Sequence, residues 1–283
     1  MVRSLLQDAL RLGIAAAIIL AAFWAGLWMW GAWNDEWSGF NAQYRVSDGS
    51  CNIAVVSLAG DITTLPLTED DTEELASYPT ANVDDILFKL RVAEYDPYVE
   101  GILLRIDSYG GMPVGSEILA DALSTSPLPI VALIREAGVS GGYMAATGAD
   151  AIFASPMSDV GGIGVTMSYV DNVAKNAKEG LGYVQLSSAP YKDYGDPNKP
   201  LTAAERAIFL RDLELVHDAF VNKVAKNRDL SEEEVAKLAD GSSMTGVLAL
   251  EHKLIDELGN QADTRGWFAR ELGLTVDEVQ FCE

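Results

Sequence analysis

The stretch PIVALIREAGVSGGYMAATG, residues 129–148, carries the strongest fold signal in this chain of 283 residues. Its first part, residues 129–134, is an apolar run typical of a buried strand in a parallel sheet. Its last part, from Tyr143 to Gly148, consists mostly of small residues that favour the first turns of a closely packed helix. The segment therefore predicts a strand, a glycine-rich turn and a helix, with the turn formed by GVSGGY at residues 138–143.

Ser140 lies in this turn, where free backbone N–H groups and the positive end of a helix dipole meet. The neighbouring glycines would let a substrate carbonyl approach the backbone without meeting a Cβ atom. This arrangement suits a nucleophile whose oxyanion is held by main-chain donors. A serine that only caps a helix after a glycine-rich turn is the structural alternative, so the rest of the chain must decide between the two.

Strand-like and helix-like segments alternate on both sides of the turn, which predicts an α/β domain with a mainly parallel sheet. Expected strands cover 52–58, 99–106, 129–134, 151–154 and 162–167. Expected helices cover 83–95, 116–123, 202–227, 231–239 and, closing the chain, 267–272. Thr202 with Glu205 and Ser231 with Glu234 match the capping-box pattern. No internal repeat or second domain boundary interrupts this order.

The charge of the chain is strongly acidic, with 20 basic against 42 acidic residues and a net charge of −22. Such a surface repels nucleic acid, which excludes that class of partner. An acidic excess also suits a protein kept soluble in high salt. The hydrophobic content of 49% is sufficient for a substantial core.

Two cysteines, Cys51 and Cys282, are present. They have neither metal-ligand spacing nor the density of a disulfide framework, so we expect no metal and no cofactor. A bridge between them is possible if the domain faces an oxidising space. Two free thiols are the favoured expectation.

The N-terminus predicts a membrane anchor. Residues 12–33 contain 22 residues without a charge, and as a helix they would span about 33 Å against a hydrocarbon core of about 30 Å. Tryptophans gather at the C-terminal end of the run, as in an aromatic belt, and Arg3 and Arg11 precede it. The positive-inside rule places the N-terminus in the cytoplasm and the rest of the chain outside. A cleaved signal peptide is the competing interpretation.

The expected organisation therefore has three parts: a cytoplasmic tip and transmembrane anchor at residues 1–33, a linker at 34–50 and a catalytic domain at 51–283. The protein would be a single-pass cell-membrane protein that contacts the lipid bilayer through residues 12–33.

Chemistry at Ser140 requires a base. The turn formally satisfies the G-x-S-x-G pattern of a nucleophile elbow, but a triad would need a histidine. The two histidines, His217 and His252, each fall in a helix-like segment and suit a structural position better than a catalytic one. Lysine is the usual substitute when histidine is absent.

Lys192 and Lys199 are the candidate bases. A lysine must be neutral to accept a proton, and lowering its pKa from about 10.4 to near 7 requires a penalty of about 4 to 5 kcal/mol on the charged form, which burial can supply. The structural alternative for Lys192 is a solvated loop lysine paired with the adjacent Asp193.

Several short motifs in the right order resemble the signal peptide peptidase A (SppA-type) family, and the similarity runs from about Ile53 to Gly259. They are DSYGG at 107–111, VSGGY at 139–143, VGGIGV at 160–165, YKD at 191–193 followed by PLT at 200–202, LADG at 238–241, TG at 245–246 and LIDELG at 254–259. Members of that family are membrane-bound Ser–Lys serine peptidases of the Clp/crotonase fold. The resemblance thus implies a Clp/crotonase-like domain of repeated βαβ units with C-terminal helices.

The resemblance also implies roles for individual residues. Ser140 would be the nucleophile and Lys192 the general base. The oxyanion would be held by backbone N–H groups of the glycine pair Gly110 and Gly111, with Gly141. Tyr109 departs from the family, which often has proline there, and tyrosine leaves this loop less rigid. The residues that would line the substrate cleft are Gly162, Ile163, Gly164, Val165 and Thr166.

The sequence as a whole predicts a membrane-anchored serine endopeptidase that cleaves hydrophobic peptides such as residual signal peptides. Longer members of the family that it resembles carry the fold twice and complete the Ser–Lys pair between neighbouring repeats. The resemblance therefore implies that this chain, with one copy, forms a homo-oligomeric ring with a shared active site. Two alternatives remain open: a crotonase-fold enzyme that processes acyl-CoA, and a non-catalytic membrane scaffold with a degenerate peptidase fold.

Overall fold

The computed structural model describes residues 23–26, 45–65 and 79–282. Apart from residues 23–26, the expected anchor at 12–33 lies outside the described residues, as do residues 34–44 of the expected linker. Within the described ranges, no helix combines the length and the apolar character needed to cross a membrane. The expected division of the chain into anchor, linker and domain stays a prediction.

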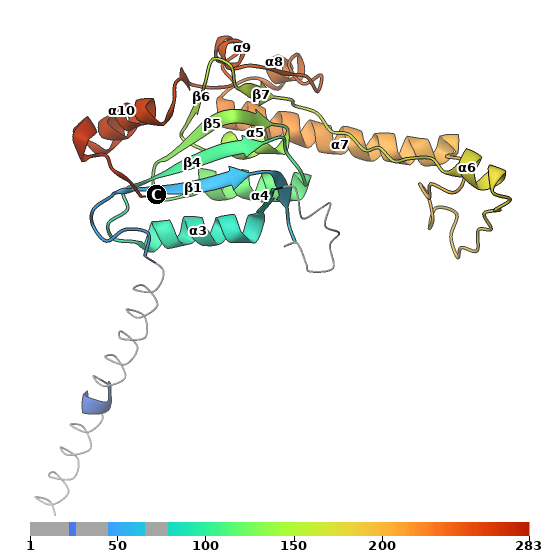
Figure 1. Cartoon of the computed structure of the whole chain (residues 1–283), viewed down its shortest axis with the longest axis horizontal. Helices are drawn as coiled ribbons and strands as arrows, with labels where there is room; N and C mark the ends of the chain where they lie inside the picture. Colours follow the sequence, from blue (N-terminus) through green and yellow to red (C-terminus); the bar gives the residue numbers. More distant parts are fainter. Residues whose placement is uncertain (1–22, 27–44, 66–78, 283) are drawn as a thin grey trace, which may run out of the picture.

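The centre of the molecule is a mainly parallel sheet (Figure 1), in the strand order β10-β1-β4-β5-β6-β9. The strands on this path, all paired in parallel, are β10 (Phe281–Cys282), β1 (Ile53–Ala59), β4 (Gly101–Ser108), β5 (Ile130–Val139), β6 (Ala151–Ala154) and β9 (Glu257–Leu258). The first half of β5 is buried on both faces, as its unbroken apolar sequence predicts. The mixed α/β architecture is confirmed.

Short strands complete the edge where the central strands end. β7 (Asp159–Gly161) pairs in parallel with the last residues of β5 and antiparallel with β8 (Ser243–Thr245). β2 (Asp61–Thr63) and β3 (Thr80–Asn82) form a separate two-stranded sheet. These additions gather the loops that follow β4 and β5 at one edge of the sheet.

Helices cover both faces of the central sheet. One face packs against α3 (Val83–Tyr95), α4 (Pro113–Ser124), α5 (Gly141–Ala146) and the C-terminal half of α7 (Ala203–Arg228). The other face packs against α10 (Gln261–Leu272), through Phe268 and Ala269. Because successive strand residues point to opposite faces, Ile102 and Leu104 belong to the first core and Leu103 to the second.

The local signals for helices are confirmed. α3 has the predicted bounds, and the Asn82 side chain caps it by accepting the backbone N–H groups of Asp84 and Asp85. Both predicted capping boxes form, at the start of α7 and at the start of α8 (Glu232–Ala236). α9 (Gly246–Glu251) lies between β8 and β9.

The expected strand at 162–167 is wrong, and the expected helix at 267–272 forms within α10 but does not close the chain. Residues 162–167 form no strand: after β7 the chain leaves the sheet with Gly162 at a positive φ of 59°. The chain also does not close with a helix, because α10 is followed by a 3₁₀ turn (Val276–Glu278) and by β10. A two-residue strand is too short for a period-2 pattern, so only its pairing with β1 defines it.

Residues 165–201, called the arm below, leave the body of the molecule. Figure 1 shows α7 running past the sheet, with α6 (Val173–Lys178) and the neighbouring loops at its far end. Every residue of the arm is at least partly exposed. The arm therefore contributes nothing to the core and is held on α7 by contacts such as the Lys199–Glu205 ion pair and the ring contact of Tyr194 with Phe209.

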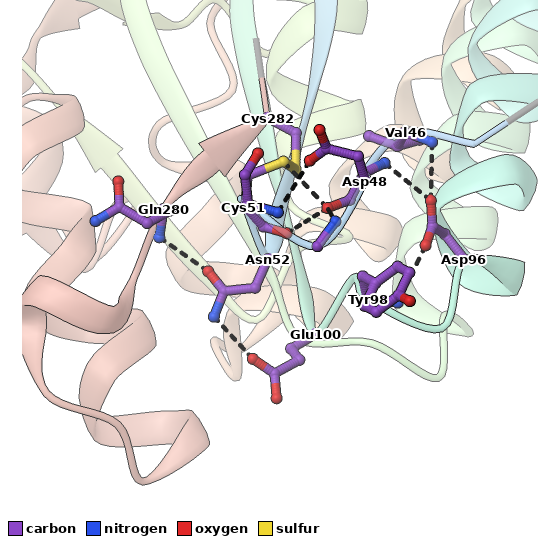
Figure 2. The surroundings of a disulfide bond; sticks show 12 residues. Val46, Asp48, Cys51, Asn52, Asp96, Tyr98, Glu100, Gln280 and Cys282 are labelled. Carbon is purple, nitrogen blue, oxygen red and sulfur yellow. Dashed lines mark hydrogen bonds between the residues drawn. A yellow bond between two sulfur atoms is a disulfide. The ribbon is translucent and has the colours of Figure 1, made fainter.

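A disulfide between Cys51 and Cys282 ties the two ends of the domain together (Figure 2), contrary to the expectation of free thiols. Ala54 pairs in parallel with Cys282, and the Cα atoms of Cys51 and Cys282 lie 5.2 Å apart. Beside the bridge, both oxygens of the buried Asp96 are engaged, one of them by the backbone N–H groups of Val46 and Ser47. Two cysteines 231 residues apart give no local signal of pairing.

We expect replacement of both cysteines by serine to lower the free energy of unfolding by about 2–5 kcal/mol, because the bridge closes a long loop and so restricts the unfolded chain. The measurement is urea denaturation of the oxidised protein and of the Cys51→Ser/Cys282→Ser variant. Treatment of the unmodified protein with a reductant is the matched control and should give the same decrease. Equal stability with and without the bridge would contradict this expectation.

Candidate active site

Ser140 has a strained backbone. Its φ of 53° and ψ of −123° place a non-glycine residue in a conformation that glycine normally occupies. Such strain costs about 1–3 kcal/mol and persists where surrounding contacts enforce it. Here the Ser140 N–H donates to Gly161 O at 2.7 Å and its carbonyl accepts from Met144 N at 2.9 Å. The turn from β5 into α5 thus has the form of a nucleophile elbow.

The loop after β4 packs directly against this serine. A Cβ atom placed on Gly110 would lie 2.8 Å from Ser140 Cβ and 3.1 Å from Ser140 Oγ. The loop is held by Ile62, whose N–H donates to Gly110 O at 2.8 Å and whose carbonyl accepts from Met112 N at 2.9 Å. Glycine at position 110 is therefore required for two loops that are distant in sequence to meet at Ser140.

Two backbone amides face the serine without a partner within the described part of the chain: the N–H groups of Gly111 and Gly141. They lie near each other, because a Cβ atom on Gly141 would be 3.4 Å from Gly111 N. The amide of Gly110 is already used, since it donates to the buried Ser108 Oγ at 3.1 Å. Of the three predicted oxyanion donors, Gly110 is thus occupied in this structure and the other two are available.

A cavity of about 270 Å³ opens beside Ser140. Its walls come from the β4–α4 loop, from α5, from residues 164–166 and from α7. The apolar side chains among them are those of Pro113, Met144, Val165, Val216 and Phe220. An apolar cavity with a hydroxyl and two free N–H groups at one end suits an apolar acyl or peptide group.

The predicted cleft residues divide into two sets. Gly164, Val165 and Thr166 line the cavity. Gly162 and Ile163 are buried instead, and both pair with the chain before β8: Gly162 N donates to Ser242 O, and Ile163 O accepts from Gly241 N. The first two residues of the predicted set therefore support the wall, and the last three form it.

Tyr143 anchors the start of α5 in the core, a role that the sequence does not reveal. It is fully buried and its hydroxyl donates to Leu254 O at 2.8 Å. Burial, with the nearby Asp256, raises the pKa of this phenol well above its usual value. Its partner lies 111 residues away in sequence, so no local pattern marks the contact. Ser108 and Ile62 escape prediction for the same reason.

Lys192 lies far from Ser140 in the same chain. It is an exposed residue of the arm, whose loops lie with α6 at the end of α7 remote from the sheet (Figure 1), and its N–H donates to Ala189 O at 3.3 Å. The structure therefore does not bring the two predicted catalytic residues together within one chain.

The alternative bases are engaged elsewhere. Lys199 forms ion pairs with Glu205 and Asp193, and these two carboxylates, Glu205 above all, raise the pKa of its ammonium group. His217 Nε2 lies 3.0 Å from Ala239 O, and because a carbonyl only accepts, this nitrogen is a donor. His252 is an exposed residue at the C-terminus of α9. We therefore set all three aside.

A larger cavity, of about 750 Å³, lies where β4 and β5 end but not at the serine. Its lining combines apolar residues such as Leu133 and Ile134 with the polar Arg105, Asp107, Arg135 and Asn260, of which Arg135 and Asp107 are paired at 3.4 Å. Tyr109 lines both cavities. Chemistry favours the smaller cavity, because it contains the strained hydroxyl and the free amides.

A serine held in a strained strand-to-helix turn, with two free amides and an apolar cavity beside it, is the arrangement of a serine hydrolase on an α/β scaffold. The sequence model of peptidase family S49 matches residues 122–275. The chain belongs to this family, which confirms the resemblance to SppA-type peptidases.

Individual relatives in sequence are named as proteases or peptidases. The chain is 33% identical over 197 residues to "Putative protease slr0021" of Synechocystis, an alignment that covers 69% of this chain and 71% of that protein. It is 28% identical over 233 residues to "Putative signal peptide peptidase SppA" of Enterococcus faecium, covering 81% of this chain and 67% of the relative. Among solved structures, a ClpP1 mutant from Listeria monocytogenes has a TM-score of 0.46 at 14% identity, covering 74% of this chain and 92% of that one.

Proposed function

We propose that this protein is a membrane-anchored Ser–Lys endopeptidase that cleaves hydrophobic peptides. The observation that carries the proposal is the strained Ser140 beside the free N–H groups of Gly111 and Gly141. Strain at a non-glycine residue persists where function requires the side chain to be presented. A serine that only capped α5 would need no such strain, and its side chain makes no capping hydrogen bond.

In the proposed mechanism, Ser140 Oγ attacks the peptide carbonyl carbon while the neutral amine of Lys192 takes the hydroxyl proton. The carbonyl oxygen gains negative charge and accepts hydrogen bonds from Gly111 N and Gly141 N. Lys192 then donates its proton to the leaving amine, and the C–N bond breaks. Water hydrolyses the acyl-enzyme, with Lys192 again acting as the base.

The proposed substrates are apolar peptide segments, residual signal peptides among them. The cavity beside Ser140 supports this choice, because side chains such as Met144, Val165 and Phe220 form its walls. Residues 164–166, which follow the last backbone pairing of this segment, lie where they could pair with an extended peptide. At a finer level of classification we place the domain in the Clp/crotonase fold, on its stacked βαβ units and on the family resemblance.

The proposed active site is completed by a second copy of the chain in a closed ring. The arm that contains Lys192 extends along α7 away from the sheet whose strand β5 leads into Ser140 (Figure 1), which supports a site completed by a neighbour. The arm also exposes apolar side chains that a partner would cover: Val170 is 80% exposed, Val184 77% and Leu186 93%. A neighbour packed on the arm would also exclude water around Lys192, which favours its neutral form.

The proposed location of the domain is the extracytoplasmic side of the membrane, with residues 12–33 as the anchor. The Cys51–Cys282 bridge supports this, because disulfides persist in oxidising compartments. The bridge closes next to the segment that leads to the N-terminal residues. An anchor there would keep the catalytic domain beside hydrophobic substrates in the bilayer.

Covalent labelling tests the proposed activity. A fluorophosphonate probe should form one adduct per active site, and peptide mapping should place it on Ser140. The Ser140→Ala variant should keep the same circular dichroism spectrum, take up no probe and hydrolyse no peptide. The matched control is Ser187→Ala, which removes an exposed serine of the arm and should leave labelling intact. An unlabelled protein, or an adduct on another residue, would favour the acyl-CoA enzyme or the scaffold instead.

A further inference from the structure

A buried ion cluster lies beside the proposed base. Lys199 Nζ is 2.6 Å from Glu205 Oε1 and 3.2 Å from Asp193 Oδ1. The three side chains are only 13%, 4% and 18% exposed, whereas most residues of the arm are open to solvent. A cluster so well enclosed in an otherwise exposed segment needs an explanation, and the peptidase mechanism described above does not use it.

The cluster occupies both oxygens of Asp193, the residue that follows Lys192. Tyr183 Oη donates to Oδ2 at 2.7 Å, and Gln185 Nε2 donates to Oδ1 at 2.6 Å. Lys199 shares Oδ1 with Gln185. On the other side, Glu205 is fixed by the N–H and hydroxyl of Thr202, each 2.9 Å from Oε2. Asp193 is thus held by two donors that precede it in the arm, Tyr183 and Gln185, and by one that follows it, Lys199.

Lys192 is left without this neighbour's charge. Within the described residues no ion pair joins Lys192 to Asp193 or to any other carboxylate. An adjacent carboxylate that was free to turn would pair with the ammonium group and stabilise its charged form. A charged lysine has no lone pair for the serine proton, so that pairing would oppose base catalysis.

We propose that Lys199 is a positioning residue: it holds Asp193 away from Lys192 and so keeps Lys192 able to act as the base for a neighbouring subunit. This inference rests on the proposed function, because it assigns a task to Lys199 only if Lys192 accepts the serine proton. In this assignment Asp193 and Glu205 both pair with the ammonium group of Lys199 and compensate its charge.

The cluster itself keeps its charges over the pH range of an assay. Lys199 lowers the pKa of Glu205 to about 2, and Glu205, with Asp193, raises that of Lys199 above its ordinary value. The Tyr183 hydroxyl and Lys199 lower the pKa of Asp193, which in turn raises that of Tyr183 to about 12. The remaining charged group nearby is Asp196, which acts on Tyr183. The cluster groups Lys199, Glu205, Asp193 and Tyr183 therefore keep their charge states between about pH 6 and pH 10.

The test is the pH dependence of kcat/KM for hydrolysis of an apolar peptide by the full-length protein in detergent. Lys199→Met leaves the donors Tyr183 and Gln185 on Asp193 but removes the positive charge that neutralises this carboxylate. It should move the pH of half-maximal activity upward by about 1 unit, since an uncompensated opposite charge nearby favours the ammonium form of Lys192. Lys199→Arg keeps the ion pairs and should move it by much less. The double variant Lys199→Met/Asp193→Asn, which has no carboxylate at the position next to Lys192, should return to the wild-type midpoint.

The double variant separates charge from structure. A loosened arm would lower activity at every pH and would stay loosened when Asp193 is also changed. The inference is therefore overturned if the pH of half-maximal activity is unshifted in Lys199→Met. It is also overturned if that pH stays shifted in the double variant. If Lys199→Met does not fold, Asp193→Asn alone decides: its midpoint should not rise, and a rise overturns the inference. If the Lys192→Ala enzyme is active, the base assignment is overturned and this inference with it. If Lys192→Ala is inactive and Lys199→Met has an unshifted pH of half-maximal activity, only the positioning role of Lys199 is overturned.

Discussion

Replacement of Lys192 by arginine is expected to lower kcat/KM for peptide hydrolysis by about 10³-fold, within the range that a general base contributes. A guanidinium group keeps its charge at any assay pH and cannot take the serine proton. Lys192 is exposed in the arm and contributes nothing to the core, so the variant should unfold at the same temperature as the wild type. The measurement is turnover of an apolar peptide together with thermal unfolding.

Lys175→Arg is the matched control for this substitution. Lys175 is also an exposed lysine of the arm, in α6, and exchanging it should leave turnover within about twofold of the wild type. If Lys192→Arg keeps full activity, the base is another group. Lys199 is then a poor substitute, because its ammonium group is bound between two carboxylates.

Much of the fold could be predicted because its signals are local. Helix α3 has the expected bounds because Asn82 caps it and apolar residues recur along one face. The unbroken apolar run at the start of β5 gave its first strand residues correctly. The strand then continues to Val139 through Arg135 and Glu136, both exposed, which end the apolar pattern but not the pairing.

What could not be predicted depends on contacts between distant segments. The Cys51–Cys282 bridge exists because β1 and β10 pair, and β10 has only two residues. The amide of Gly110 is lost as an oxyanion donor because it donates to Ser108 Oγ, and that hydroxyl is in turn held by Gly60 O, 48 residues away in sequence. Neither the motif nor the resemblance contains that information.

The candidate site was predicted unevenly for a similar reason. Ser140 follows from a turn whose glycines are visible in the sequence, and its positive φ gives that interpretation physical support. Lys192 has no such local signal: it is an exposed loop lysine, and only the resemblance to the family distinguishes it from Lys199. Its separation from Ser140 in one chain is a property of the fold, since it follows from the position of the arm along α7.

A shared active site leads to a second large expected effect, which is the recovery of activity in mixed assemblies of two inactive variants. Ser140→Ala and Lys192→Ala subunits are each expected to be inactive alone. In a mixed ring each site takes its serine from one subunit and its lysine from the next. When equal amounts assemble at random, half of the sites have the serine and half of those also have the lysine, which restores about a quarter of wild-type activity.

The most direct measurement is therefore the peptidase activity of the two variants co-expressed in equal amounts, with different affinity tags so that mixed assemblies are isolated. The shared site predicts activity near a quarter of the wild type, and no activity when the same variants are purified separately and combined without subunit exchange. If both residues acted within one subunit, every site in the mixed assembly would lack one of them. Activity near zero in isolated mixed assemblies would contradict the shared site.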